Sequence, residues 1–354
     1  MTATSPVRGE PGSWEWAACG ASVTGSQHIA KGLGCDDAFG YGIAGDFAVA
    51  VIADGAGSVS GTSAWGSFVA CQSVLDNAMS RETVRRFMKA DTAKAEGLMR
   101  WLFDDALDRL THQAELMRLP LPLLSTTLSV AVATPERTVF GQIGDGIIAV
   151  DQRGSVETVL IEDKGEYPNA TWFVQTNGAF EESYRSCTLP AIDAFALSTD
   201  GMSYKITNVT TGEAYAPFFT GSWDHVRTGA DEASFAALLR GIEDDQTGDD
   251  KTMVLLVRRW EPDGFHPTPR PTRRLVVQSR VPPRPPDAGR EAAVPPAASA
   301  KLMEGGAPAP APVTGARPVA PPPVPAGADS VTEDLRVDAE ARRPRLRLGR
   351  RVPK

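Results

Sequence analysis

The sequence predicts an α+β protein in which layers of sheet and helix pack on one another, rather than a doubly wound parallel sheet. Helical patterns are grouped over about residues 64–119 and do not alternate one for one with strands. From residue 125 the apolar periodicity becomes that of short strands separated by turn signals, which is typical of an antiparallel meander. Near residue 260 the composition changes abruptly, and this marks the end of the domain.

Composition divides the 354 residues into three parts. We expect a flexible arm at residues 1–13, one large domain at residues 14–260, and a disordered tail rich in Pro, Ala and Arg at residues 261–354. The tail holds 20 of the 28 prolines and lacks the apolar surface that would offset the entropy of ordering it. Its 16 Lys and Arg and 10 Asp and Glu give the tail a net charge of about +6. Residues 1–260 hold the other 20 Lys and Arg and 34 Asp and Glu, a net charge of about −14. An acidic domain argues against nucleic acid as its partner.

The first half of the domain predicts two strands and a group of helices. Trp14 to Val23 alternates as a strand does, and a polar segment with several glycines follows at residues 24–39. Phe47 to Ala53 is apolar throughout, as in a buried strand. Apolar residues recur at steps of four and three from Ala64 to Ala78, which predicts a helix, and residues 81–119 predict one or two more that end at a pair of prolines.

The second half predicts short strands and one further helix. Strands are expected at residues 125–133, 137–143, 147–151, 156–161, 194–198 and 253–257. Residues 163–193 are irregular with room for strands, residues 202–231 are ambiguous, and residues 233–242 predict a helix with one apolar side.

Acidic residues stand at the ends of several apolar runs. Asp54 and Asp200 each follow a fully apolar run and precede a glycine, Asp145 lies between two glycines and two strands, and Asp249-Asp250 precedes the last strand. An unpaired charge at the end of a buried strand would be costly, which favours a bound cation. Glycine has no side chain, so the Gly55 carbonyl can approach the same ion. Oxygen ligands of this kind suit Mg²⁺ and Mn²⁺.

Plainer interpretations exist for two of these positions. A hairpin turn alone would account for Asp145, and residues 243–250 would also suit a solvated acidic loop. The spacing of Cys19, Cys35, Cys71 and Cys187 shows neither a CxxC pair nor a zinc pattern. Residues 1–20 lack the pattern of a signal peptide, and no run of 18 apolar residues occurs. The expected location is therefore the cytoplasm, with no transmembrane segment.

Six short motifs occur in a fixed order within residues 15–258. They are Cys35-Asp36-Asp37-Ala38, Ala53-Asp54-Gly55-Ala56-Gly57, Ser125-Thr126-Thr127, Ile143-Gly144-Asp145-Gly146, Leu197-Ser198-Thr199-Asp200-Gly201 and Asp249-Asp250-Lys251-Thr252. Together they resemble the metal-dependent serine/threonine protein phosphatases of type 2C, in their bacterial branch. The resemblance implies a four-layer sandwich of two antiparallel β-sheets flanked by α-helices. It also implies that a water activated by two Mn²⁺ or Mg²⁺ ions hydrolyses a phosphomonoester of a phosphorylated protein.

The resemblance implies a role for each acid. Asp54 would bridge the two ions, the Gly55 carbonyl would join one of them, and Asp200 and Asp249 would complete the first. Asp37 matches the invariant acid of the first motif and would belong to the metal site, Asp36 would act through a water, and Asp145 would bind a third, weaker ion. Asp250 stands where the family usually has Asn.

The phosphate-gripping Arg of the family has no counterpart in this chain. Gly32 stands near its place, and Lys31 and His28 are the nearby candidates for the phosphate contact. His28 is also the candidate general acid for the leaving alkoxide, with an ordinary hydrogen-bonded or surface histidine as the alternative. The missing Arg leaves two other functions open: a catalytically weak, phosphatase-like module that binds or regulates, and a phosphatase of a small phosphorylated molecule.

The expected partner is a phosphorylated protein substrate made by a serine/threonine kinase. The polyproline runs of the tail would suit a spacer or a ligand that binds an aromatic groove of a partner. The basic end of the tail would suit binding to an acidic partner or to a membrane surface. A solvated tail with no partner is the alternative.

Overall fold

A computed structural model describes residues 12–56, 62–161, 171–208, 210–242, 247–262 and 272–277. The predicted N-terminal arm lies outside these ranges except for its last two residues. Most of the predicted tail, including the whole of a second unit at residues 291–354, lies outside them too.

Two sheets form the middle of the fold, and neighbouring strands are antiparallel throughout them. The first sheet has the order β1 (Gly12–Val23), β10 (Lys251–Pro262), β9 (Ala194–Ser198), β6 (Ile147–Gln152) and β7 (Ser155–Val159). The second has the order β11 (Thr272–Val277), β2 (Ala38–Ala44), β3 (Phe47–Ala53), β4 (Leu128–Ala133), β5 (Arg137–Ile143) and β8 (Arg185–Pro190).

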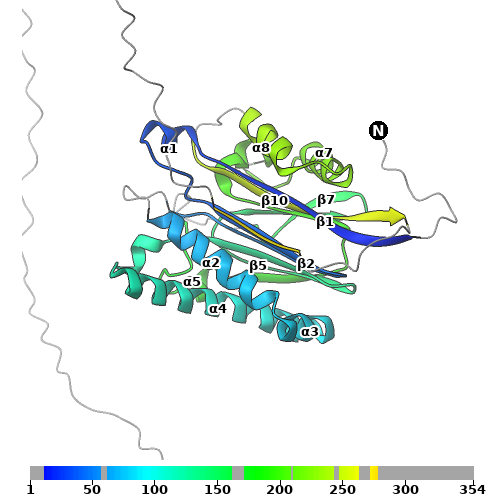
Figure 1. Ribbon diagram of the computed structural model, residues 1–354, viewed down its shortest axis with the longest axis horizontal. Coiled ribbons are helices and arrows are strands. Elements are labelled where there is room, and N and C mark those ends of the chain that lie inside the picture. Colours follow the sequence, from blue (N-terminus) through cyan, green and yellow to red (C-terminus); the bar gives the residue numbers. More distant parts are fainter. Residues whose placement is uncertain are drawn as a thin grey trace, which may run out of the picture. The chain divides into compact units, whose positions relative to one another are not determined.

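Helices cover the outer face of each sheet (Figure 1). On the second sheet lie α2 (Ser63–Ala78), α3 (Arg81–Lys89) and α4 (Thr92–Met117), and on the first lie α7 (Ala216–Arg227) and α8 (Glu232–Gly241). Shorter helical turns are α1 (Ser26–Ala30), η1 (Leu121–Leu124), α5 (Ala179–Glu182), η2 (Asp200–Met202) and α6 (Ser203–Ile206). Within the described residues, no helix combines the length and apolar character needed to span a membrane.

The core has three apolar layers, and strand β3 shows how they arise. Side chains alternate between the faces of a strand. Val49 and Val51 therefore pack with the helices α2 and α4, while Ala50 and Ile52 pack with the other sheet. A third apolar layer joins the first sheet to α7 and α8 through residues such as Trp223. Helix, sheet, sheet and helix thus follow one another, which confirms the predicted four-layer sandwich.

The strand β2 was not predicted, because glycines interrupt its apolar pattern. A Cβ at Gly40 would lie 2.5 Å from the Leu75 side chain, and one at Gly42 would lie 2.5 Å from Met79. Glycine at these positions lets the side chains at the end of α2 pack directly on this strand. The turn α1 was also missed, and the ambiguous residues 202–231 contain α6 and α7.

The strand β11 corrects the predicted boundary of the tail. We expected residues 272–277 to have no structure, but they pair with β2 at the edge of the second sheet. Arg273 forms an ion pair with Asp76 of α2 (2.5 Å), and Arg274 forms one with Glu232 of α8. The surrounding prolines hide this strand in the sequence, and its ion pairs depend on residues far away in the chain.

Gly66 and Gly97 provide a matched test of the close packing of α2. A Cβ at Gly66 would overlap the Leu124 carbonyl oxygen, whereas one at Gly97 of α4 would meet nothing within 4 Å. Both glycines lie inside helices, where Ala is intrinsically favoured by about 0.5–1 kcal/mol. We expect Gly97→Ala to raise the free energy of unfolding by about that amount, and Gly66→Ala to lower it by about 1–3 kcal/mol. Urea unfolding measures both, and equal effects would contradict the packing described.

Candidate active site

The predicted acids converge at one end of the two sheets. Asp37 immediately precedes β2 and Asp54 immediately follows β3, and the register pairs Ala38 with Ala53, which places the two acids side by side. On the other sheet, the start of β10 pairs with the end of β9. Asp249 and Asp200 therefore meet at the same end. Asp145 lies in the turn between β5 and β6, which belong to different sheets.

Three glycines allow the loops that carry these acids to touch. A Cβ at Gly25 would overlap the backbone of Asp249, and one at Gly201 would overlap the Asp250 carbonyl oxygen. A Cβ at Gly55 would lie 2.6 Å from the Asp36 carbonyl oxygen. Any side chain at these positions would force the acid-bearing loops apart.

Burial and mutual repulsion disfavour ionisation of the clustered acids. Burial is the largest cause that raises the pKa of Asp54, followed by the negative charges of Asp37, Asp200, Asp249 and Asp145. Burial also raises the pKa of Asp37, with the Asp250 charge as the next cause, and burial raises the pKa of Asp249. A cation among these groups would favour their charged forms. The donor set consists of oxygens, so it fits a hard divalent ion such as Mn²⁺ or Mg²⁺.

The threonine-rich motif at residues 125–127 fixes the backbone of Asp54. The Thr126 hydroxyl and the Thr127 N–H both donate to the Asp54 carbonyl oxygen, each at 2.9 Å. The Asp54 N–H donates to the Thr127 hydroxyl at 3.0 Å. The N–H and the carbonyl oxygen of Asp54 thus have hydrogen-bond partners within the protein, and the Asp54 carboxylate remains available to a ligand.

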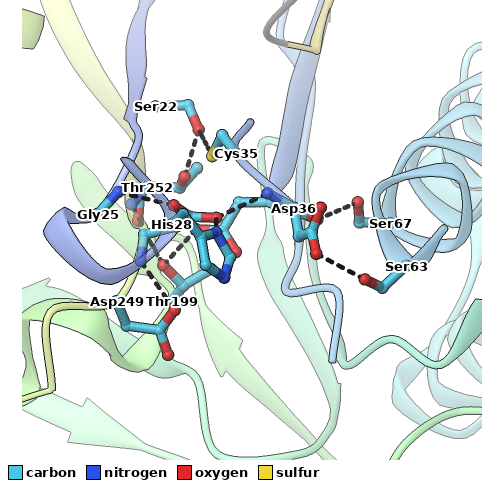
Figure 2. A network of polar contacts seen from close by, with 12 residues as sticks. Ser22, Gly25, His28, Cys35, Asp36, Ser63, Ser67, Thr199, Asp249 and Thr252 are labelled. Atoms are coloured by element: carbon cyan, nitrogen blue, oxygen red, sulfur yellow. Dashed lines mark hydrogen bonds and ion pairs between the residues drawn. The ribbon is translucent and has the colours of Figure 1, made fainter. Parts of the chain in front are cut away.

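Asp36 and Asp37 are held by neighbouring hydroxyl groups. The Ser63 hydroxyl donates to Asp36 Oδ2 (2.7 Å) and the Ser67 hydroxyl donates to the Asp36 carbonyl oxygen (2.6 Å), so the N-terminal turns of α2 secure this residue (Figure 2). The Thr199 hydroxyl donates to Asp37 Oδ2 at 3.0 Å. Asp145 is half-buried and accepts a hydrogen bond from the Thr171 hydroxyl at 2.9 Å.

Asp250 connects three loops through a buried carboxylate. Its Oδ1 accepts from the Gly25 N–H (2.7 Å), and its Oδ2 accepts from the Asp36 N–H (2.6 Å). Oδ2 also lies 2.9 Å from His28 Nδ1. Asp250 is 2% exposed and His28 is 6% exposed, so this ion pair is shielded from water. Figure 2 shows His28 in the middle of the network.

The Asp250 carboxylate favours a protonated His28. The hydrogen bond to Asp250 is the largest cause that raises the pKa of His28 to about 9, against a smaller opposing effect of burial. His28, Asp249 and Asp250 also offer ligand atoms within 4.8 Å of one another, a spacing that would suit a metal ion. The ion pair and the two N–H donors already account for His28 Nδ1 and for the Asp250 carboxylate, so we assign these groups to the protein's own polar network and not to a metal ion.

Lys31 is the predicted site residue that the contacts do not bring to the acids. It is exposed at the C-terminal end of α1, and among the described residues no ion pair joins it to a carboxylate. Sequence reasoning also missed the partnership of Asp250 with His28, as well as the two serines of α2. One signal was available in the sequence, because this chain departs from the family pattern at two positions. It has Asp250 where the family usually has Asn, and it has no Arg near residue 32.

Comparison with known proteins agrees with this geometry. Residues 24–240 match the family described as Protein phosphatase 2C. Serine/threonine-protein phosphatase 3 of Escherichia coli (strain K12) is 26% identical over 252 residues, which cover 68% of this chain and 97% of the relative.

Solved structures of bacterial phosphatases are also similar to this chain, at low identity. Stp1 of Staphylococcus aureus is 16% identical, with a TM-score of 0.44, over 72% of this chain and 99% of that one. The catalytic domain of PstP, solved in complex with two manganese ions, is 17% identical, with a TM-score of 0.42, over 70% of this chain and 100% of that one.

The family match spans more than half of the chain and includes five of the predicted acids, Asp36, Asp37, Asp54, Asp145 and Asp200. It confirms the resemblance drawn from the motifs. This chain belongs to the protein phosphatase 2C family of metal-dependent serine/threonine phosphatases and is a phosphoprotein phosphatase.

Proposed function

We propose that this chain hydrolyses phosphoserine or phosphothreonine in proteins at a centre of two Mn²⁺ or Mg²⁺ ions. Asp54, the Gly55 carbonyl, Asp200 and Asp249 would hold the ions, with Asp145 as a ligand of a third. The observation that carries the proposal is the convergence of acids from separate strand ends on Asp54, whose pKa they raise. Such ions, when bound, supply an activated water as nucleophile and positive charge for the phosphoryl oxygens. The two manganese ions of PstP agree with this assignment.

The chain's own residues contribute positioning. Asp36 and Asp37 would orient the waters and ligands around the ions, because the α2 serines and Thr199 fix these acids in place. The fixed Asp54 backbone does the same for the central carboxylate. Groups held in advance need no reorganisation during the reaction, which is the source of electrostatic catalysis.

We assign to His28 the delivery of a proton to the leaving oxygen. Its Nδ1 faces Asp250, which leaves Nε2 as the ring atom that can reach a substrate. The imidazolium also places a positive charge near the acids where the family usually has Arg. Lys31 remains a predicted phosphate contact, from an exposed position on the same segment.

Asp54→Asn tests the metal centre. We expect the full chain to dephosphorylate a phosphothreonine peptide with Mn²⁺ or Mg²⁺ but not with chelator, and Asp54→Asn to lower kcat by roughly 1,000-fold or more, because a central charge is lost. Asp108→Asn removes the same charge from an exposed position of α4 and serves as the control. Retained activity in Asp54→Asn would reject the proposed centre. A wild type that binds Mn²⁺ in calorimetry yet turns over no phosphopeptide would favour the regulatory or small-molecule alternative.

His28→Gln tests the proton donor through the leaving group. We expect kcat for the phosphothreonine peptide to fall by about 100-fold, within the usual range for general acid catalysis. Turnover of p-nitrophenyl phosphate should change little, because its leaving group departs without a proton. Equal losses on both substrates would instead indicate that His28 supports the structure of the site.

The raised pKa of His28 predicts a pH-dependent stability. Folding raises the pKa of His28 from 6.5 to about 9, so protonated His28 stabilises the folded state. This contribution is complete at a pH below 6.5, the pKa in the unfolded chain, and it disappears as the pH rises through about 9, the pKa in the folded protein. In chelator, we expect the difference in free energy of unfolding between wild type and His28→Gln to shrink by about 3 kcal/mol from about pH 6 to about pH 10. Groups that do not interact with His28 titrate alike in both proteins, so their contributions cancel. A difference that stays constant with pH would contradict the buried ion pair.

A further inference from the structure

A pocket lies between α3 and the first turns of α4, away from the acids. It has a volume of about 520 Å³, within the usual range of binding pockets. The helix α2 separates it from the candidate active site: its first turn holds Asp36, and its last turn leads into α3. Sixteen helical residues span about 24 Å. Figure 1 shows α3 and α1 at opposite ends of the domain.

The rim of this pocket is basic, although the domain is acidic. Arg85, Arg86, Lys89 and Lys94 line it, with Glu82 as the one acid among its lining residues. Residues 81–94 contain five Lys and Arg against two Asp and Glu, within a domain of about −14. A local reversal of charge of this kind attracts an anionic partner to one place on the surface.

Two of the rim cations have no acidic partner in the part of the chain that the structure describes. No carboxylate there lies within 4.0 Å of Arg86 or Lys89, and Arg86 stacks over Trp101 at 5.7 Å. Arg85 pairs with Glu82 at 3.3 Å and Lys94 with Asp91 at 2.7 Å, but all four side chains are well exposed. Exposed pairs contribute little, so a ligand can replace them at small cost.

The floor of the pocket is apolar and firmly supported. Ala90 and Leu98 line it at 5% exposure, and both belong to the core between the helices and the second sheet. Gly97 adds an opening in the floor, since a Cβ there would meet nothing within 4 Å. An apolar side chain of a ligand would therefore find a preformed surface with positive charges around it.

We propose that this α3–α4 basic pocket docks an acidic segment of a partner protein, with an apolar side chain of that segment on the floor and its carboxylates on the rim. The apolar floor favours a peptide over nucleic acid, whose backbone would contact only the rim. The net charge of the domain opposes a long polyanion or a flat anionic membrane. The proposal goes beyond the phosphatase reaction, because the pocket lies at the other end of α2 from the metal centre.

Fluorescence anisotropy tests the docking without using enzyme activity. The probe is a labelled peptide of alternating Asp and Glu around one Leu, and the control peptide carries Asn and Gln in their place. We expect the full chain to bind the acidic peptide in a salt-dependent manner and to ignore the neutral one. The double variant Arg86→Glu, Lys89→Glu should bind at least tenfold more weakly.

Gly97→Leu tests the floor separately from the charges. A Cβ at this position would meet nothing within 4 Å, so we expect the added side chain to occupy the opening and to weaken binding at least fivefold while the unfolding midpoint does not fall. Gly221→Leu on α7, where a Cβ also meets nothing within 4 Å, is the matched control and should bind as the wild type does. Unchanged binding in both pocket variants would overturn the proposal. So would capture of anionic vesicles or DNA at the pocket in place of the peptide.

Discussion

The candidate active site depends on one buried anion, the Asp250 carboxylate. Burying a charge is costly unless it is paired and hydrogen-bonded. Here two backbone N–H groups and the His28 imidazole supply the compensation, and each comes from a different part of the chain from Asp250. The same carboxylate therefore draws the segment before α1 and the segment before β2 onto the loop that carries Asp249. Its removal would leave an imidazolium and two N–H groups buried without their acceptor. This requirement keeps the loops around the acidic cluster in their arrangement.

The remaining acids act against folding, and the sandwich supplies the opposing energy. Burial disfavours the charged forms of Asp37, Asp54 and Asp249, and the nearby charge of Asp200 disfavours the charged form of Asp54 further. Two of the strands that carry them, β3 and β9, are fully buried in the middle of their sheets. Their apolar contacts hold the ends in place, and glycines let the loops close. A cation bound at the proposed centre would relieve this repulsion. Stability and metal affinity would then be coupled through the same carboxylates.

The sequence predicted those parts of the fold whose cause is local. Strands β3, β5 and β9 have the predicted bounds, because an unbroken or alternating apolar run suffices to define a strand. It did not predict β2, because the glycines that allow α2 to pack on this strand interrupt its apolar pattern. It did not predict β11 either, because the ion pairs of this strand join it to helices far away in the chain. In the site, an acid after an apolar run was a sufficient signal for Asp54 and Asp200. The pairing of His28 with Asp250 joins the two ends of the domain and has no local signature.

The two ends of α2 give the domain two electrostatically opposite regions. Its first turns hold Asp36 in the acidic cluster, and its last turn leads to the basic rim above Leu98. A rigid helix keeps them about 24 Å apart. An extended chain covers about 3.3 Å per residue, so about eight residues are enough to link a docked acidic segment to a phosphorylated side chain at the metal centre. A substrate held in this way would react at a raised local concentration without any new contact at the reacting phosphate. Selectivity could then depend on the docking segment, which fits a centre that has lost the family's phosphate-gripping Arg.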